Sequence, residues 1–205
     1  MAGLKIVTDF SDYYDSLSDS NAKIVYNRKY SECNQRGTAL NILRKHAGIK
    51  TIDLKPVSDF LYSGTRIVVY TNPKLHNGEG KRIMTVEEAM QSYSNYIASR
   101  YYEECDSFVK FLQVGSRRFT INYKRNNKES LTDNSVIDIS EATSGYNKLL
   151  GLPIYSIDYI AVDNAMIATD FNEVECLKHC GIERFMTAEQ VVEEIQKSLI
   201  AYNKG

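Results

Sequence analysis

The sequence has 205 residues and a mass of 23.4 kDa, and its 25 basic and 26 acidic side chains leave a net charge of −1. This length and a hydrophobic share of 43% predict one globular domain with a core of its own, and they exclude a disordered or fibrous chain. The near-neutral charge disfavours a general nucleic-acid binder, and no stretch is long and apolar enough to cross a bilayer.

The first part of the chain predicts short strands and one helix. Residues 4–7 and 23–30 are rich in apolar, β-branched and aromatic side chains, which favours strands. Residues 38–46 contain good helix formers and are followed by Gly48, a typical stop signal. The run RIVVY at residues 66–70 predicts a buried central strand, which ends before Pro73 because proline cannot donate to a sheet.

Two capping-box motifs mark the starts of the two principal helices. In each motif a threonine is followed three residues later by Glu or Gln, and the two side chains satisfy exposed amides of the first turn. The pairs are Thr85 with Glu88 and Thr187 with Gln190, and apolar residues then recur every three or four positions. The pattern predicts a long helix from Thr85 to about residue 108 and a closing helix from Thr187 to about residue 202.

The chain between these two helices predicts mainly strands. We expect strands at 108–114, 118–123 and 154–162, a hairpin turn at Gly115 and Ser116, and a short helix at 173–179 that ends before Gly181. Helices and strands alternate too irregularly for a doubly wound parallel sheet. The predicted fold is therefore a single α+β domain, residues 1–205, with its helices packed on one mixed β-sheet.

No familiar catalytic or metal-binding motif is present in the sequence. It contains no Walker loop, nucleophile elbow or dinucleotide-binding glycine motif, and residues 78–81 indicate an exposed turn. Cys176, His179 and Cys180 share one helical face without a second ligand pair, so packed thiols are the preferred interpretation. The absence of a signal core near the N-terminus favours a cytosolic protein with reduced cysteines. We therefore predict no catalytic residue, no metal and no cofactor.

A basic segment at residues 115–128 is the most unusual local feature. It holds five cations and no acidic residue, and Arg118 and Lys124 share one face of the expected strand. Arginine binds phosphate bidentately and tyrosine stacks on a base, so we predict an anionic ligand site. A charged edge strand that prevents aggregation is the alternative. The candidate ligand-binding residues are Arg117, Arg118, Lys124, Arg125, Tyr14, Tyr26 and Arg28.

Both ends of the chain resemble a known group of proteins. The N-terminal string KIVTDFSDYYD at residues 5–15 is followed by IVYNR at 24–28, and the C-terminal part contains PIYSIDYI at 153–160 and a Gly-Ile-x-x-Phe segment at 181–185. These stretches are similar to an uncharacterised group of tailed-bacteriophage proteins. No catalytic residues are established for that group, so none is carried over to this chain. The resemblance implies a viral protein that acts in the host cytoplasm.

The leading hypothesis is a non-enzymatic phage accessory protein that antagonises host defence by binding and sequestering a phosphate-bearing nucleotide signal. Its expected partner is a small anionic, nucleotide-like ligand and not a membrane, and the formation of homo-oligomers is left open. One alternative is a metal-dependent nucleotide-cleaving enzyme that uses Asp9, Asp12 and Asp15 as carboxylate ligands. Another is an inhibitor whose basic strand contacts an acidic host protein.

Overall fold

The computed structural model describes residues 36–61, 64–72, 80–131, 133–142, 152, 154–173 and 181–202. Within these ranges no helix is long and apolar enough to cross a membrane. The strands expected at 4–7 and 23–30, the aspartates at 9, 12 and 15, and the helix expected at 173–179 beyond its first residue lie outside the described residues.

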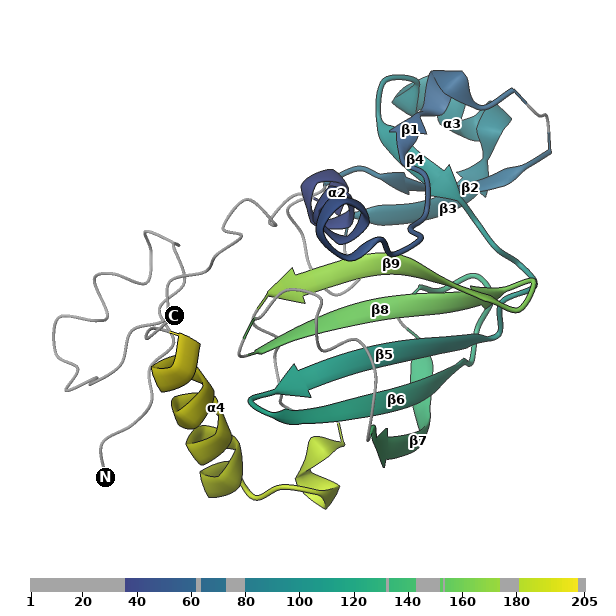
Figure 1. The fold of residues 1–205 in the computed structure, drawn as a ribbon. Coiled ribbons are helices and arrows are strands. Elements are labelled where there is room, and N and C mark those ends of the chain that lie inside the picture. Colours follow the sequence, from purple (N-terminus) through teal and green to yellow (C-terminus); the bar gives the residue numbers. More distant parts are fainter. Residues whose placement is uncertain are drawn as a thin grey trace, which may run out of the picture.

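The described strands form two antiparallel sheets (Figure 1). The smaller sheet has the order β1-β4-β2-β3, with β1 (Lys55–Pro56), β2 (Arg66–Tyr70), β3 (Lys81–Thr85) and β4 (Ile97–Arg100). The larger sheet has the order β7-β6-β5-β8-β9, with β5 (Ser107–Val114), β6 (Arg117–Arg125), β7 (Asn134–Glu141), β8 (Ile154–Val162) and β9 (Ala165–Glu173). The α+β class is confirmed, although the strands divide into two antiparallel sheets where we expected one mixed sheet.

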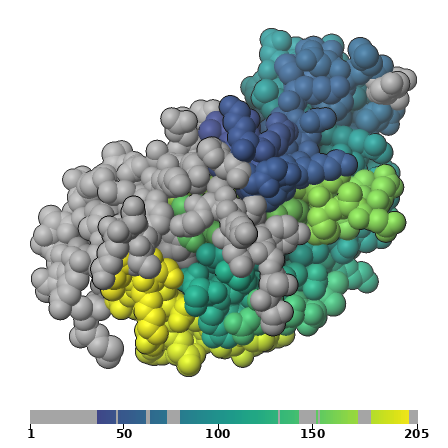
Figure 2. All heavy atoms as spheres, viewed as in Figure 1, coloured from purple at the N-terminus to yellow at the C-terminus, as the bar shows by residue number. Residues whose placement is uncertain are grey.

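Helices α2 (Arg36–Ala47) and α4 (Ala188–Tyr202) cover opposite faces of the larger sheet. The core beneath α2 contains Phe111 and Tyr155, whereas the core beneath α4 contains the adjacent residues Leu112 and Ile154. Consecutive residues of a strand point to opposite faces, so the two helices bury different sides of the same strands. In Figure 2 the dark-blue atoms of α2 lie against the green atoms of β9. Two single turns of 3-10 helix, Val57–Asp59 and Ile182–Arg184, complete the described helices.

The predicted hairpin between β5 and β6 is confirmed. Val114 pairs with Arg117, and the turn between them contains Gly115 with a φ of +61°. A Cβ atom at Gly115 would lie 2.6 Å from the backbone oxygen of Glu194 in α4, and Ser116 donates its hydroxyl to the Glu194 carboxylate at 2.6 Å. The hairpin therefore approaches α4 so closely that only glycine fits its first turn position.

The helix that begins at Thr85 is shorter than the sequence pattern predicts. Both reciprocal hydrogen bonds of the capping box are present, at 3.3 Å and 2.9 Å, but α3 (Val86–Tyr93) ends well before residue 108. Residues 97–100 form β4 and residues from 107 onward form β5. Apolar residues spaced by four lie on one face of a strand as well as of a helix, so the apolar spacing beyond Tyr93 did not distinguish the two structures.

Replacement of Thr85 by alanine is expected to lower the free energy of unfolding by about 1 kcal/mol, because the Glu88 amide in the first turn of α3 loses the Thr85 hydroxyl as its acceptor. Urea unfolding followed by circular dichroism measures the loss. Ser92→Ala is the control, since this exposed position lies inside α3 and alanine is a better helix former there. Equal destabilisation by both substitutions would show that the capping box does not stabilise this helix.

The pairing of β8 with β9 contains one irregularity. Asp158 pairs with Asp170, but the next residue, Tyr159, pairs with Ala168, which leaves Thr169 without an opposing residue. This β-bulge adds one residue to β9 and disturbs the alternation of its side chains. As a result Asp170 lies beside Asp158, and Ile167 lies beside Ile160, although three positions separate the two β9 residues.

Candidate functional site

A cavity of about 340 Å³ lies between the two sheets. Its wall combines side chains from β2, β3 and β4 of the smaller sheet with side chains from β5, β6, β8 and β9 of the larger one, and Arg36 of α2 joins them. On the larger sheet, Lys110, Tyr123 and Asp158 have the same strand parity as the residues beneath α4. One face of the larger sheet therefore carries α4 near the hairpin and the cavity at the other end of the strands.

A row of charged side chains crosses the larger sheet at the cavity. Lys110, Asp158 and Asp170 are direct neighbours on β5, β8 and β9. The Lys110 Nζ lies 3.3 Å from Asp158 Oδ1, and Arg36 Nη2 donates to Asp170 Oδ2 at 2.8 Å. Arg36 also donates to the carbonyl oxygen of Thr169, the residue at the bulge. The bulge thus places a carboxylate and a carbonyl oxygen side by side for one guanidinium.

Lys81 faces this charged row from the smaller sheet. It is the first residue of β3 and pairs with Tyr70 of β2, whose ring lies 5.1 Å from the Arg36 guanidinium. Burial, followed by the positive charge of Arg36, lowers the pKa of Lys81 to about 8, while Asp170 and Asp158 act in the opposite direction. The prediction of an exposed turn at residues 78–81 was wrong for Lys81, because this lysine starts β3 and lines the cavity.

Tyr70 contributes a buried hydroxyl to the same wall. Its Oη lies 3.0 Å from Ser99 Oγ in the neighbouring strand β4. Burial raises the pKa of Tyr70, and the nearby Arg36 charge lowers it to a smaller degree. Tyr70 is therefore a neutral phenol at physiological pH, so the positive charges around it are not compensated from this position.

Arg125 lies at the end of β6 nearest the smaller sheet and is 7% exposed. Its Nη1 donates to Tyr101 Oη at 2.7 Å, and its guanidinium carbon lies 4.8 Å from the centre of the Phe108 ring. Tyr101 in turn donates its hydroxyl to the carbonyl oxygen of Lys128. These contacts fix the guanidinium in the cavity wall between two aromatic rings.

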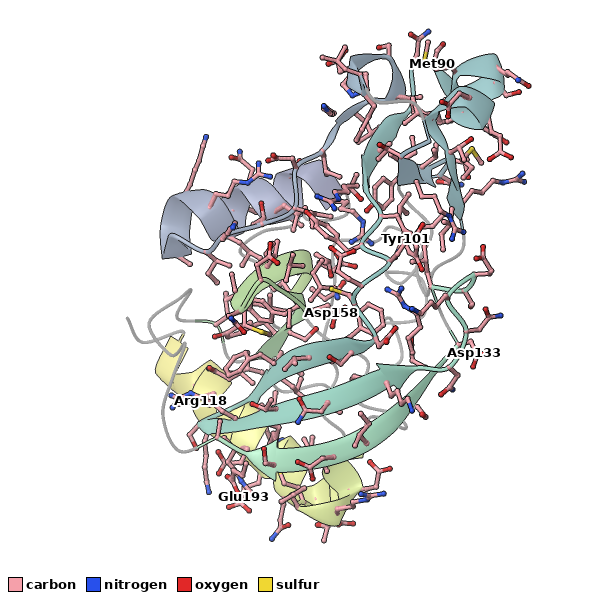
Figure 3. All side chains as sticks on the ribbon, turned by 90° about the vertical axis from the view of Figure 1, so that its right-hand side faces the viewer. Met90, Tyr101, Arg118, Asp133, Asp158 and Glu193 are labelled. Atoms are coloured by element: carbon pink, nitrogen blue, oxygen red, sulfur yellow. The ribbon has the colours of Figure 1, made fainter. Side chains whose placement is uncertain are left out.

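Of the ligand-binding residues predicted from the sequence, Arg125 lines the cavity. Arg117 forms a bidentate pair with Glu141, with both N···O distances at 2.7 Å, and Lys124 is exposed. Arg118 and Lys124 have the parity opposite to Tyr123 and Arg125, so they point away from the cavity. Figure 3 shows Arg118 at the far end of the larger sheet from Tyr101 and Asp158. Tyr14, Tyr26 and Arg28 lie outside the described residues.

Sequence reasoning missed the other charged residues of the cavity. Asp158 and Lys110 were detectable, because each is the single charged residue of an otherwise largely apolar strand, IYSIDYIAV and SFVKFLQV. A charge in a buried strand needs a partner and so indicates a site. Arg36 and Lys81 carry no comparable local signal, since they begin a helix and a strand, where basic residues are common.

The sequence matches no protein-family model, and no curated protein is similar to it in sequence. Solved structures, however, share its fold. The D-alanine–D-alanine ligase from Bacillus anthracis superposes with a TM-score of 0.55 at 12% identity, covering 94% of this chain and 84% of the ligase. The ATP-grasp ligase PsnB, solved with Mg and ADP, gives 0.56 at 14%, covering 93% of this chain and 65% of PsnB. The biotin carboxylase domain of Hydrogenobacter thermophilus 2-oxoglutarate carboxylase, solved with MgADP, gives 0.52 at 12%, with 83% and 46% covered.

These superpositions concern the fold alone: with TM-scores of 0.52 to 0.56, the path of this chain follows that of the three proteins. At identities of 12–14% the similarity is limited to the fold, so the chemistry of this chain follows from its own residues.

A magnesium ion shared with a phosphate ligand would find two carboxylates in the cavity wall, Asp158 and Asp170. Asp158 and Asp170 are neighbours on the same face, and Mg²⁺ in proteins is commonly held by one or two carboxylates together with substrate phosphates. No group of three or more His, Cys, Asp or Glu side chains gathers anywhere in the described ranges, so these residues do not form a complete protein cage. In addition Lys110 and Arg36 engage the two carboxylates, and the ion would compete with them.

Proposed function

We propose that the cavity between the two sheets binds a nucleoside diphosphate or triphosphate, with the phosphates at Lys81 and at the Lys110–Asp158–Asp170 row. The observation that carries this proposal is the excess of positive charge at the wall. Among the described residues the cavity is lined by Arg36, Lys81, Arg100, Lys110 and Arg125, against only Asp158 and Asp170. Cations concentrated in a chain of almost neutral total charge create a local positive potential that favours a phosphate ligand.

The size and the aromatic lining of the cavity also support a nucleotide. A volume of about 340 Å³ lies at the lower end of the range of small-molecule sites. Phe108 and Tyr123 are direct neighbours on β5 and β6, and Tyr101 and Tyr102 line the cavity where the chain passes from the smaller to the larger sheet. Aromatic rings next to a cationic groove are the usual platform for a nucleobase.

Two of the structurally similar ligases were solved with ADP and magnesium, which supports the same class of ligand for this chain. When bound together with the nucleotide, a divalent cation supplies charge neutralisation for the phosphates. In this chain Asp158 and Asp170 would hold the cation, Lys81 would contact the phosphates from the opposite sheet, and Arg36 would shift from the carboxylate to the phosphates.

Calorimetric titration with ATP, ADP and AMP, each with and without MgCl₂, tests the proposal. We expect ATP and ADP to bind at least about tenfold more tightly than AMP, because AMP lacks the phosphates that reach Lys81 and Lys110. Arg118→Met and Lys124→Met are matched variants whose side chains point away from the cavity, and they should bind as the wild type does. A folded protein that releases no heat with any of the three nucleotides would refute the proposal.

The narrower hypothesis, a phage protein that sequesters a nucleotide signal without turning it over, stays a prediction. It is distinguished from turnover by the state of the ligand after incubation. We expect a sequestering protein to return the intact nucleotide upon denaturation, whereas an ATP-dependent transfer or cleavage leaves ADP or AMP. Liquid chromatography of the denatured mixture separates these outcomes, and the accumulation of product would replace sequestration with catalysis.

A further inference from the structure

Arg125 carries a buried positive charge without a counter-charge among the described residues. Its side chain is 93% buried, since 7% is exposed, and its Nε has no hydrogen-bond partner in the described part of the chain. The contacts that the structure gives it are the Tyr101 hydroxyl and the rings of Tyr101 and Phe108, which are all neutral. An uncompensated buried charge is costly, so a ligand that brings a negative charge to this position is favoured.

A second incomplete polar group lies directly beside Arg125. Asn134 is its cross-strand partner on β7, and both side chains line the cavity. The Asn134 Nδ2 donates to the carbonyl oxygen of Leu131 at 3.3 Å, whereas its buried Oδ1 has no partner in the described part of the chain. Because the amide can be turned about its final bond, Asn134 can present a donor to the same ligand group as the arginine does.

This pair is separate from the phosphate-binding row. Arg125 is four residues beyond Ile121, the β6 neighbour of Lys110, and β8, which carries Asp158, is two strand spacings from β6 because β5 lies between them. With about 3.3 Å per residue and about 4.8 Å between strands, the two charged positions are about 16 Å apart across the sheet. The apolar row Tyr123, Phe108 and Ile160 lies between them. One phosphate group therefore cannot satisfy both ends of the cavity.

We propose that Arg125 and Asn134 form a second anion subsite, which binds a carboxylate or phosphate group beyond the nucleotide phosphates. The planar guanidinium edge that contains Nε binds such a group through two parallel hydrogen bonds, and Tyr101 and Phe108 hold that edge in place. The proposal deepens the proposed function, because it gives the cavity a second acidic ligand or a ligand with acidic groups at both ends. The subsite itself does not depend on nucleotide binding.

The test follows the Arg125 Nε–H signal by nuclear magnetic resonance in ¹⁵N-labelled protein. Sodium acetate and inorganic phosphate are titrated separately at constant ionic strength, and Arg125→Gln assigns the signal. We expect at least one anion to shift the signal to saturation, and the two titrations distinguish a carboxylate from a phosphate ligand. Lys81→Met should leave this response unchanged even where it removes ADP binding, so the failure of one proposal is separable from the failure of the other.

Asn134→Asp provides an independent variant with almost the same shape. It places a carboxylate across the strand pair from Arg125. We expect the variant to unfold at a higher temperature than the wild type and to show no further response of the Arg125 signal to either anion. A signal that responds to neither anion in the wild type would overturn the subsite. So would a signal that responds only to ADP, which would assign Arg125 to the nucleotide, and so would an Asn134→Asp protein whose Arg125 signal still responds to either anion.

Discussion

Replacement of Lys81 by methionine is expected to weaken the binding of ADP and ATP by about 10- to 150-fold, the usual loss for a charge-assisted contact. Lys81 is the partly buried cation that the smaller sheet presents to the cavity lined by Asp158 and Asp170. Methionine keeps most of the apolar stem but removes the charge, so the fold should survive. Calorimetric titration at pH 7 with each nucleotide measures the effect.

The same lysine predicts how affinity depends on pH. The pKa of Lys81 in the free protein is lowered to about 8, and a bound phosphate favours the protonated amine. Affinity should therefore be highest below pH 8 and should fall as the pH rises through 8, because binding then has to take up a proton. Titrations between pH 7.5 and 9.5 are suitable, since a terminal phosphate with a second pKa of about 6 stays ionised throughout.

Two variants control this experiment. Lys81→Arg keeps a charge at every pH, so it should bind the nucleotides with little change between pH 7.5 and 9.5. Lys128→Met removes an exposed lysine that pairs with Asp106 and does not line the cavity, so it should keep the wild-type affinity. A Lys81→Met protein that binds ADP as tightly as the wild type would exclude Lys81 from the phosphate site.

Replacement of Gly115 by alanine is expected to reduce the free energy of unfolding by about 2 to 5 kcal/mol. Its φ of +61° is in the left-handed region, which disfavours any residue with a Cβ. The added Cβ would also lie 2.6 Å from the Glu194 backbone oxygen, so either the hairpin or α4 has to move. Urea unfolding measures the loss. The packing of the α4 residues Ile195 and Leu199 against the larger sheet should loosen as well.

Gly48→Ala is a matched control for the hairpin glycine. Gly48 has a φ of +64°, but no atom lies within 4 Å of the Cβ position. Alanine there should lower the free energy of unfolding by about 1 to 2 kcal/mol, the cost of a left-handed backbone conformation for a residue with a Cβ. The difference between the two losses in unfolding free energy measures the cost of the steric contact between the hairpin and α4. Equal losses would mean that α4 adapts to the added Cβ without cost.

Local signals in the sequence predicted the parts of the fold that depend on local interactions. The capping boxes at Thr85 and Thr187 mark the starts of α3 and α4, and Gly115 with Ser116 marks the turn of the hairpin. The prediction that the helix reaches residue 108 was wrong, because apolar residues four positions apart share a face in a strand as well as in a helix. Strands β3, β7 and β9 were not predicted, since KRIMT and NSVIDISE lack a strong apolar alternation.

The cavity could not be assembled from the sequence because its residues are distant along the chain. Arg36 and Asp170 are 134 positions apart, and their contact depends on the packing of α2 against β9. Arg125 of the basic segment lines the cavity, yet the sequence did not show which strand face opens onto it. That face is set by the pairing of β6 with β5, where Tyr123 lies beside Phe108.

Thr169 matters to the cavity through its backbone carbonyl and not through the strand pairing. It has no opposing residue on β8, so a chain without it would pair β8 and β9 as an unbroken ladder, with Asp158 still beside Asp170 and Ile160 still beside Ile167. Such a chain would lose the carbonyl oxygen that accepts a hydrogen bond from Arg36. A relative with a gap at position 169 would therefore keep the acidic neighbour pair while its arginine at position 36 is held by Asp170 without the second acceptor.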